Sequence, residues 1–590
     1  MAGEEPGRLA EPVAAPSSAR IALWILIALA ILAPWPFGST QPWAVRAVTL
    51  IALVTAIAVS FEQARRGALH LSHGPLGPVA VLVALGFIHL IPLPAGLHAI
   101  LAPGSAAVWH PEGAATASLL TSKARPISIH PAATSEWLAA TGALLALAAL
   151  AAPALGRRRT VTAVTWTLVA AGTLVAIYGI VARAVFGPLL FGYIVVPTVS
   201  PFGPFVNKNH FAGYVEMPAL LALGLGRGLW RQHAKAADSA VPAPSPYALV
   251  AFGASAAMVM AVLLSLSRGG ALGVLSGIAT FAFLDYATAR HRGSLGKVVA
   301  PVALAAVLVA IVFLMPGEVH ERLLGIARSR DDSTLYRIAI WKDAIHAWMA
   351  SPILGQGLGA FADVIPRFKT TAGLFRVNHP ESEPIEIAVE GGLVALLAAG
   401  AALGLLFVRS IAASRGHRDR VQRGIVTGAL AGMVALTVHG FVDFNLRIPS
   451  NALMFVSLAV LAAAPLGSVQ WLRLGRRWAF VGALLAVLVV YTRGSEGWPL
   501  LREARASALK ATQADARSAP LRVSLAQRRA REYLELRPAD PEGWLLAAWT
   551  IGARGRPDEA AAVARYATTL DPQSKALLDQ ANAIAGSPPP

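Results

Sequence analysis

Residues 137–155 read WLAATGALLALAALAAPAL and contain no charged side chain. A helix of about 20 apolar residues is long enough to cross the hydrocarbon core of a bilayer. Runs of this kind recur along the chain, whereas the short alternating segments typical of membrane β-barrels do not. The sequence therefore predicts an all-α polytopic membrane helix bundle with about 12–13 transmembrane helices. The thirteen predicted spans are residues 21–37, 43–61, 75–95, 137–155, 160–185, 211–229, 246–266, 270–288, 298–315, 385–408, 424–441, 450–466 and 478–492.

The composition of the 590-residue chain agrees with this fold class, because 56% of its residues are hydrophobic and only 14% are charged. Soluble proteins are on average about 25% charged. The chain has no cysteine, which excludes disulfides, zinc–thiolate sites, iron–sulfur clusters and cysteine nucleophiles. This absence is compatible with an oxidising compartment but does not identify one.

Basic residues alternate between the connections of the predicted spans. Lys and Arg are enriched in cytoplasmic connections, and this rule accounts for the net charge of +18. A nucleic-acid interface would need a basic soluble face that carries aromatic residues, which the sequence lacks. The rule predicts a cytoplasmic tail over 1–20, a membrane domain over 21–495 and a periplasmic loop over 316–384. The basic connections assigned to the cytoplasm contain Arg65, Arg66, Arg157, Arg158, Arg159, Arg227, Arg231, Arg290, Arg292, Arg409, Arg423, Arg473, Arg476 and Arg477.

The first apolar run, residues 21–34, leaves one alternative open. Arg8 and Arg20 precede it and it includes Ala28-Leu29-Ala30, so a cleaved signal peptide is compatible with the pattern. An uncleaved first span is favoured, because a second predicted span follows at once.

The last 95 residues are more charged than the membrane domain and contain a repeat. Leu536-Arg537-Pro538 and Leu570-Asp571-Pro572 place two prolines 34 residues apart, which is the period of a tetratricopeptide repeat. We expect a periplasmic, tetratricopeptide-like helical domain over 497–586 and a disordered tail over 587–590. The alternative is a bare helical tail. Because two hairpins alone are marginally stable, the domain is expected to pack on the membrane domain or on a protein partner.

A first polar cluster opens the predicted span 211–229. Asn207, Asn209 and His210 precede it, and Glu216 lies inside it. Asparagine is a good helix cap, so a capped helix with interfacial anchors is the simpler interpretation. An intramembrane carboxylate is nevertheless a functional hypothesis by default, and we take these four residues as candidate substrate-binding residues.

Two arginines are candidates for binding a phosphate. Arg268 follows Ser267 in a tight turn between two spans, where Gly269 and Gly270 would let a ligand approach; the alternative is a snorkelling arginine. Arg337 lies four residues before Trp341, so one face of a helix would carry both. That pair could hold an anion and stack on a sugar, or belong to a helix that lies on the membrane surface.

The stretch VNHPESEPIE, residues 377–386, is the densest group of polar residues. His379 could act as a general base, and with Glu381 and Glu383 it could also bind a divalent cation. Glu386 and Glu390 would lie on one helix face, with Arg268 and Arg337 as candidate partners. The alternative is a polar lip above the next span.

Two further motifs complete the candidate residues. Gly355, Gly357 and Gly359 lack the preceding strand and following Gly-Lys-Ser/Thr of a nucleotide-binding loop, so they predict a turn after a helix. His439, Asp443 and Arg447 lie at the outer end of the eleventh predicted span. They are candidate substrate-binding residues, with interfacial anchoring as the alternative.

Together these motifs resemble those of the O-antigen ligase/polymerase superfamily over roughly residues 200–450. The resemblance rests on the Ser-Arg-Gly-Gly turn at 267–270, the helix with Arg337 and Trp341, the Gly-rich turn, His379 and Glu390-Gly391-Gly392. The stretch with His439, Asp443-Phe444-Asn445 and Pro449 is similar to the late segment of the family, and tetratricopeptide extensions occur among its members.

The resemblance implies a bacterial inner-membrane glycosyltransferase that takes a glycan from an undecaprenyl-diphosphate carrier at the periplasmic face. It implies inversion at the sugar carbon and no metal or other cofactor. Arg268 and Arg337 match the arginines that hold the diphosphate, and His379 matches the histidine that activates the acceptor. The family usually follows this histidine with Asn and an aromatic-Leu pair, whereas Pro380 follows here. Glu381 and Glu383 therefore remain alternative catalytic residues.

The acceptor is expected to be a glycan, a lipid A core or a protein. Two other classes of function remain open at this point. A transporter or flippase of a lipid-linked anionic glycan would use the same arginines without breaking a bond. A scaffold of a polysaccharide assembly complex would use the C-terminal repeats to bind proteins.

Overall fold

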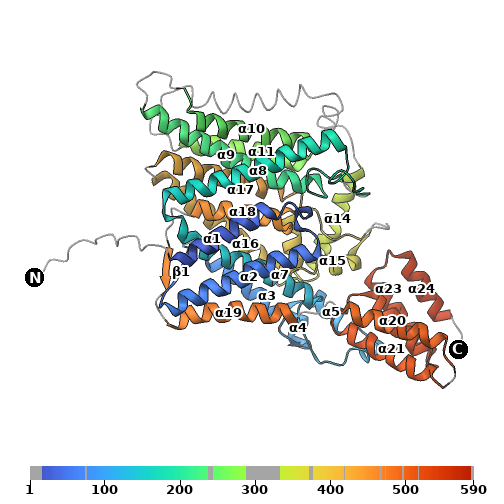
Figure 1. The fold of residues 1–590 in the computed structure, drawn as a ribbon. Coiled ribbons are helices and arrows are strands. Elements are labelled where there is room, and N and C mark those ends of the chain that lie inside the picture. Colours follow the sequence, from blue (N-terminus) through green and yellow to red (C-terminus); the bar gives the residue numbers. More distant parts are fainter. Residues whose placement is uncertain are drawn as a thin grey trace, which may run out of the picture.

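The chain is a helical bundle with a small helical domain at one end (Figure 1). In the computed structural model, the described residues are 16–72, 76–197, 200–236, 243–287, 332–370, 376–416, 419–463, 468–471, 474–493, 497–515 and 517–586. Helices occupy every predicted span except the ninth, residues 298–315, which lies outside the described residues. Within that part of the chain, eight helices are long and apolar enough to cross a membrane, so the predicted all-α polytopic membrane fold is confirmed.

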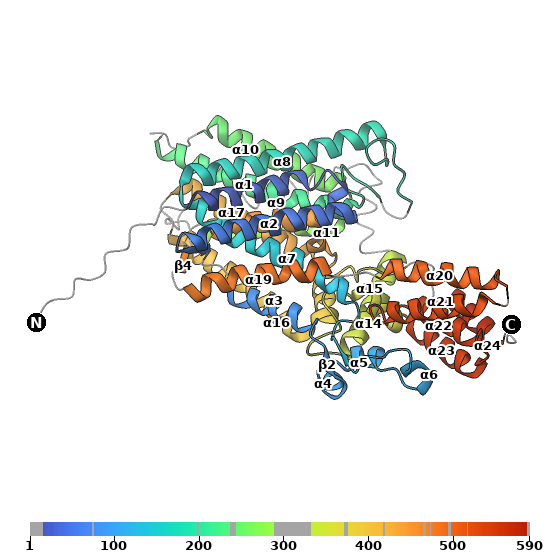
Figure 2. The same ribbon diagram turned by 60° about the horizontal axis from the view of Figure 1, so that its bottom comes forward.

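The bundle consists of long helices that run side by side (Figures 1 and 2). Its described helices are α1 (Ser17–Leu32), α2 (Pro42–Arg65), α3 (Leu76–Ile88), α7 (Pro131–Ala151), α8 (Arg158–Phe186), α9 (Lys208–Ala236), α10 (Pro246–Leu264), α11 (Arg268–Ala287), α16 (Glu383–Gly416), α17 (Arg420–His439), α18 (Pro449–Ala463) and α19 (Leu474–Arg493).

Small residues let α9 and α17 approach each other closely in the core of the bundle. A Cβ atom on Gly224 would lie 2.3 Å from the carbonyl oxygen of Gly424, and one on Gly428 would lie 2.6 Å from that of Leu220. Small residues at such crossings are typical of membrane helices, whose association depends on close packing. The contact holds in place the helices that carry Glu216 and His439.

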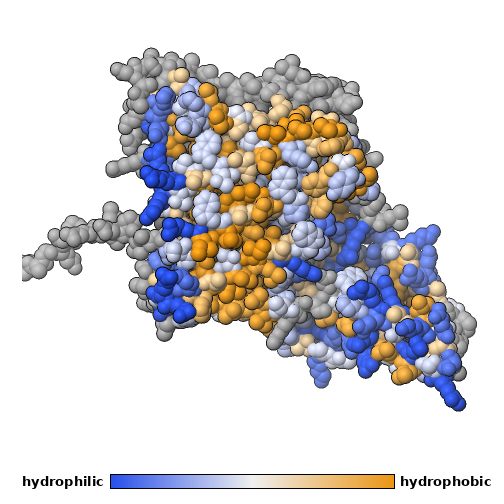
Figure 3. Space-filling view, in the orientation of Figure 1, coloured by the Kyte–Doolittle hydropathy of each residue, from blue (hydrophilic) through white to orange (hydrophobic). Residues whose placement is uncertain are grey.

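Connections with arginine gather at one end of the bundle. Arg158 pairs with Asp419 at 3.1 Å, and Arg231 pairs with Asp285 at 2.8 Å. Strand β1 (Leu69–Ser72) pairs antiparallel with β4 (Ser468–Trp471) at this end. Figure 3 shows hydrophilic side chains at this end, apolar side chains across the middle of the bundle, and more hydrophilic ones over the C-terminal helices. The Arg158–Asp419 pair joins two connections that the sequence assigned to one side of the membrane.

Short elements and α14 (Asp332–Met349) build the opposite end. The short helices are η1 (Phe37–Ser39), α4 (Ala95–Leu101), α5 (Pro103–Trp109), α6 (Ala114–Ala117), α15 (Phe361–Val364), η4 (Ile365–Phe368) and η5 (Asn445–Arg447). Strands β2 (Leu93–Pro94) and β3 (Ala124–Arg125) pair antiparallel there. The short helix η2 (Ala152–Gly156) instead prolongs α7.

The C-terminal residues form packed helical hairpins, so the interpretation as a bare tail is wrong. The helices are α20 (Trp498–Thr512), α21 (Ala519–Leu534), α22 (Pro541–Gly552), α23 (Pro557–Leu570) and α24 (Lys575–Gly586). Asp540 caps α22 by accepting from the backbone N–H of Glu542, and Trp544 is fully buried. The assignment of these hairpins to the tetratricopeptide family stays a prediction.

The hairpins dock on the membrane domain, as expected from their small core. Arg125 forms an ion pair with Glu535, and Arg537 pairs with Asp363 at 2.6 Å. The hydroxyl of Tyr566 donates to the carbonyl of Val108 at 3.3 Å. The C-terminal helices therefore lie beside α5, α6 and α15 (Figure 2).

Candidate functional site

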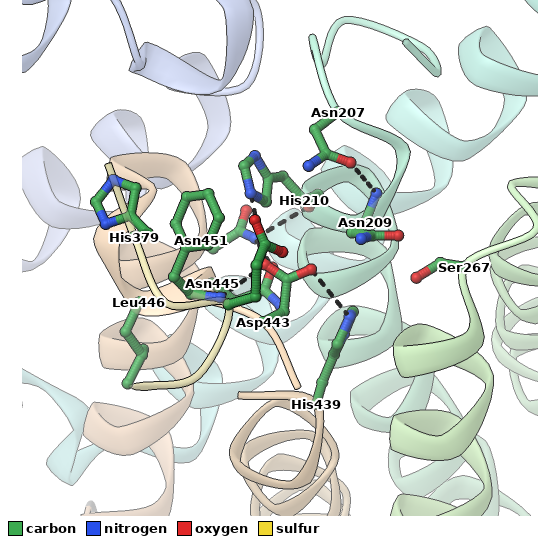
Figure 4. Close-up of polar contacts among 12 residues, drawn as sticks. Asn207, Asn209, His210, Ser267, His379, His439, Asp443, Asn445, Leu446 and Asn451 are labelled. Atoms are coloured by element: carbon green, nitrogen blue, oxygen red, sulfur yellow. Dashed lines mark hydrogen bonds and ion pairs between the residues drawn. The ribbon is translucent and has the colours of Figure 1, made fainter. Parts of the chain in front are cut away.

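Polar side chains converge where α9, α11, α16 and α17 meet, at the end of the bundle opposite the arginine-rich connections. Figure 4 shows His210, Asp443 and His439 close together, with His379 on one side of this group and Ser267 on the other. The structure thus brings together candidates that lie more than 200 residues apart in sequence. Three sets of contacts build the site.

The floor of the site consists of Glu383, Glu386, Glu390 and Arg447. The guanidinium of Arg447 lies 3.7 Å from the carboxylate of Glu383, 3.5 Å from that of Glu386 and 2.7 Å from that of Glu390. Burial alone would lower the pKa of Arg447, but the three carboxylates outweigh it and raise this pKa. The sequence suggested Arg268 and Arg337 as partners of Glu386 and Glu390, whereas the structure shows Arg447 in that place.

A break in α16 fixes the Gly-rich turn against the floor. Gly392 has φ +63°, and a Cβ atom there would lie 2.2 Å from the carbonyl oxygen of Ile353. The N–H of Gly357 donates to the carbonyl of Glu390 at 2.9 Å, and the N–H of Phe361 donates to its carboxylate at 3.2 Å. The glycines therefore allow close backbone packing, in agreement with the predicted turn.

His379 has the surroundings of an oriented base. Its Nδ1 lies 2.9 Å from the carboxylate of Glu386, and its ring stacks on Phe444 with centroids 4.1 Å apart. Within the described residues its Nε2 has no hydrogen-bond partner, and the side chain is 33% exposed. Burial lowers the pKa of His379, but the attraction of Glu386 prevails and raises it. A carboxylate on one ring nitrogen and an accessible second nitrogen is the arrangement of a general base.

The rim of the site consists of Arg337, Trp341, Pro380 and Glu381. Arg337 is 36% exposed and lies 3.4 Å from the carboxylate of Glu381. The indole N–H of Trp341 donates to the carbonyl of Pro380 at 2.7 Å. Burial, reinforced by the charge of Asp443, raises the pKa of Glu381 to about 7 in spite of Arg337. Glu381 has φ +55°, an uncommon conformation for a non-glycine residue that is often found at functional sites.

A third set of contacts, fully inside the protein, connects α9 with α17. Nδ1 of His439 lies 3.2 Å from the carboxylate of Glu216, and its Nε2 lies 3.9 Å from that of Asp443. Asp443 also faces His210 at 3.6 Å. Burial would raise the pKa of Asp443, but His210 and His439 outweigh it and lower this pKa.

Glycines on α11 make room for these buried groups. A Cβ atom on Gly269 would lie 2.4 Å from the ring of His439, and one on Gly273 would lie 2.7 Å from the carboxylate of Glu216. The expected ligand approach at Gly269 therefore has a competing explanation, since the position packs on a side chain of the protein.

The remaining candidates lie at helix starts. Ser267 accepts from the N–H of Gly270 at 3.1 Å, and Asn207 accepts from the N–H of Asn209 at 2.9 Å. The Asn207 contact is the helix cap that the simpler interpretation of the sequence predicts, and Ser267 caps the start of α11, a role that the sequence analysis did not assign. Arg268 is exposed at the first turn of α11, beside the Gly269–His439 contact.

The structure adds residues that the sequence analysis did not assign. Phe444 stacks on His379, and Asn451 donates both to the carbonyl of His210 and to Asn445 at 3.0 and 2.9 Å. The Asp-Phe-Asn motif marked part of this set, but no sequence signal showed what it contacts. Glu381 pairs with Arg337 and Glu383 with Arg447, and the described residues contain no group of three His, Asp or Glu side chains placed to hold a metal ion, which disfavours the alternative cation site.

Comparison with known families gives one match. A family model described as O-antigen ligase matches residues 253–400, which include the later part of α10, all of α11 and α14, and the first half of α16. No curated protein matches the chain. The matched range contains Arg268, the rim, His379 and the three glutamates of the floor.

Proposed function

We propose that this membrane protein transfers a glycan from a lipid-diphosphate carrier to an acceptor hydroxyl, and the match of residues 253–400 to a family model described as O-antigen ligase supports this proposal. The observation that carries the proposal is the His379–Glu386 pair together with the half-exposed Arg337, which contacts Glu381 two residues after His379. This arrangement of His379, Glu386 and Arg337 supplies a base and a cation within one polar site at the end of a membrane helix bundle. Undecaprenyl diphosphate is the proposed carrier.

The proposed reaction is a displacement at the anomeric carbon of the donor sugar. The acceptor hydroxyl gives its proton to Nε2 of His379 as its oxygen bonds to that carbon. The bond from this carbon to the diphosphate oxygen breaks, and the configuration inverts. Arg337 and Arg268 stabilise the negative charge that develops on the departing diphosphate, so no metal ion is required.

Glu386 and the floor act on the base rather than on the substrate. The carboxylate of Glu386 fixes which nitrogen of His379 carries the proton and stabilises the cation formed after proton transfer. Arg447 in turn holds Glu386 and its two neighbours. We therefore assign Glu383, Glu386, Glu390 and Arg447 as positioning residues, whereas the sequence alone suggested direct roles for Glu383, Glu390 and Arg447.

The side of the membrane follows from charge. Since the arginine-rich connections gather at one end, the positive-inside rule supports a cytoplasmic location for that end. The site, the rim and the C-terminal helices would then face the periplasm of a bacterial inner membrane. There a lipid diphosphate is a suitable leaving group that needs no nucleotide.

In vitro transfer tests the proposal. Purified protein in nanodiscs would be given a defined undecaprenyl-diphosphate glycan together with a glycan, a lipid A core or a peptide acceptor, and products would be read by gel shift. We expect transfer to one acceptor class, with loss in Arg268→Ala, Arg337→Ala and His379→Ala. Normal transfer by all three variants would refute the assignment, and movement of the intact lipid without transfer would favour the flippase alternative.

A further inference from the structure

A cavity of about 750 Å³ lies between the membrane domain and the C-terminal helices. One wall comes from α15, η4 and the chain leading to His379, and the other from the starts of α20, α22 and α24. Figure 2 shows these helices on the same side of α15. The volume is that of a small-molecule site, and such sites often form between domains.

The lining of this cavity carries both signs of charge in equal numbers. Its cationic residues are Lys369, Arg376, Arg537 and Lys575, and its anionic residues are Asp363, Asp540, Glu542 and Asp571. A polyanion would favour an excess of cations, and a lipid chain would favour apolar walls. Hydrogen-bond donors and acceptors on all sides, with the amides of Gln573 and Gln580, suit a neutral ligand rich in hydroxyl groups.

An aromatic side chain completes the lining. Trp498 at the start of α20 is 37% exposed, and the guanidinium of Arg537 lies over its ring at 4.9 Å. An indole presents an apolar body with one polar N–H, which suits a sugar ring that has apolar and hydroxyl faces.

Ion pairs hold the wall of the cavity next to the chain segment that carries His379. Asp363 accepts from Arg537 at 2.6 Å and from Arg376 at 3.1 Å, and it lies 2.7 Å from Nδ1 of His130. The hydrogen bond with His130 and the charges of Arg537 and Arg376 outweigh burial and keep the pKa of Asp363 well below its usual range. Arg376 precedes His379 by three residues. The wall of the cavity and the segment with the base are thus one continuous stretch of chain.

We propose that this cavity binds a stretch of the glycan several sugar units away from the reacting end. This proposal rests on the function proposed above, because it concerns which glycan the same site uses as a substrate. Binding there would hold the chain while its end reaches His379, so longer glycans would be used better than single repeat units. The ligand class is a neutral or zwitterionic oligosaccharide.

Direct binding tests this without any transfer step. The probes are oligosaccharides of one and three repeat units, released by mild acid from the surface polysaccharide of the strain that encodes this chain. Isothermal titration of the full-length protein in nanodiscs should show tighter binding of the longer probe. Asp571→Asn and Lys575→Ala should each weaken it about tenfold, the value of one charge-assisted hydrogen bond.

Matched variants serve as controls. Asp579→Asn lies on the same helix as Lys575, and Lys510→Ala lies at the far end of α20; neither residue lines the cavity, and both should bind the probe normally. Equal binding by Asp571→Asn, Lys575→Ala and the controls would overturn the proposal. Binding of a Lys-Asp peptide without binding of either oligosaccharide would also overturn it.

Transfer kinetics separate this proposal from the proposed function. In the two cavity variants we expect KM for the three-unit acceptor to rise about tenfold, with kcat and the one-unit acceptor unchanged. Saccharide binding that depends on Asp571 and Lys575 in a protein that transfers nothing would support the cavity and refute the enzyme. Transfer with unchanged KM in both variants would support the enzyme and refute the cavity.

Discussion

The floor and the rim of the site each pair arginine with glutamate, but in opposite ways. On the floor, Arg447 meets three carboxylates and is only 15% exposed. On the rim, Arg337 meets one carboxylate at 3.4 Å and is 36% exposed. An ion pair out of water requires full compensation, whereas an exposed pair is weak and exchanges its partner easily. The floor is therefore built for stability and the rim for binding.

The strongest test removes the cation of the floor. Arg447→Ala would take from Glu383, Glu386 and Glu390 the cation that they share, leaving His379 beside Glu386, and removing one partner of a buried pair costs about 3–5 kcal/mol. We expect loss of folded protein and of all transfer. Thermal unfolding and size-exclusion chromatography of the detergent-solubilised protein would measure this.

Two further variants test whether the loss of the buried cation explains the expected loss of stability. Arg46→Ala breaks an ion pair with Glu136 whose side chains are 52% and 45% exposed, and it should change stability little. Adding Glu390→Gln to Arg447→Ala should restore part of the stability, because one buried charge is removed. A stable Arg447→Ala protein would show that water reaches the carboxylates of the floor. The floor would then not differ from the rim in its contribution to stability.

The corresponding change on the rim should separate activity from stability. Arg337→Ala removes an exposed cation, so we expect normal unfolding but a transfer rate about 10²–10³-fold lower, the usual effect of losing one charge-stabilising group. Lys342→Ala, which removes another exposed cation from the same helix, is the control and should retain full activity. Parallel losses of stability and activity in Arg337→Ala would make the rim a second structural cluster.

The parts of this architecture that depend on local sequence could be predicted. The spans follow from the length of apolar runs, the cap of α9 from Asn207, and the turn from its glycines. The sequence also identified Arg337 and His379 as candidates. Each of these features is decided within a few residues, so no knowledge of the tertiary fold is required.

The pairings across the chain could not be predicted. Arg447 lies 57 residues from Glu390, and Asp363 lies 174 residues from Arg537. From the sequence alone, several arginines were equally plausible partners for each glutamate, because the pairing depends on how the helices pack. The stack of Phe444 on His379 could not be predicted either, because the Asp443-Phe444-Asn445 motif does not show what its aromatic ring contacts.

The link between floor and base can be tested by pH. Glu386→Gln removes the charge that raises the pKa of His379, so this pKa should fall. Because the base works in its neutral form, the acidic limb of the rate–pH profile should move to lower pH, with a rate about tenfold lower at its plateau. The exposed Glu112→Gln is the control. A limb that stays in place would mean that another group takes the proton.

The prediction with the smallest expected effect tests whether Glu381 or His379 is the general base. Burial gives Glu381 a pKa of about 7, so above this pH its carboxylate competes with the anionic donor for Arg337, and below it the competition ends. KM for the donor should therefore be a few-fold higher at pH 8 than at pH 6, and Glu381→Gln should remove this difference while leaving kcat near normal. Glu381→Asp keeps the charge and tolerates the φ of +55°, so it should keep the pH dependence. If Glu381→Gln instead loses kcat by about 10²-fold or more at every pH, Glu381 is the base, and the rim carries the chemistry as well as the binding.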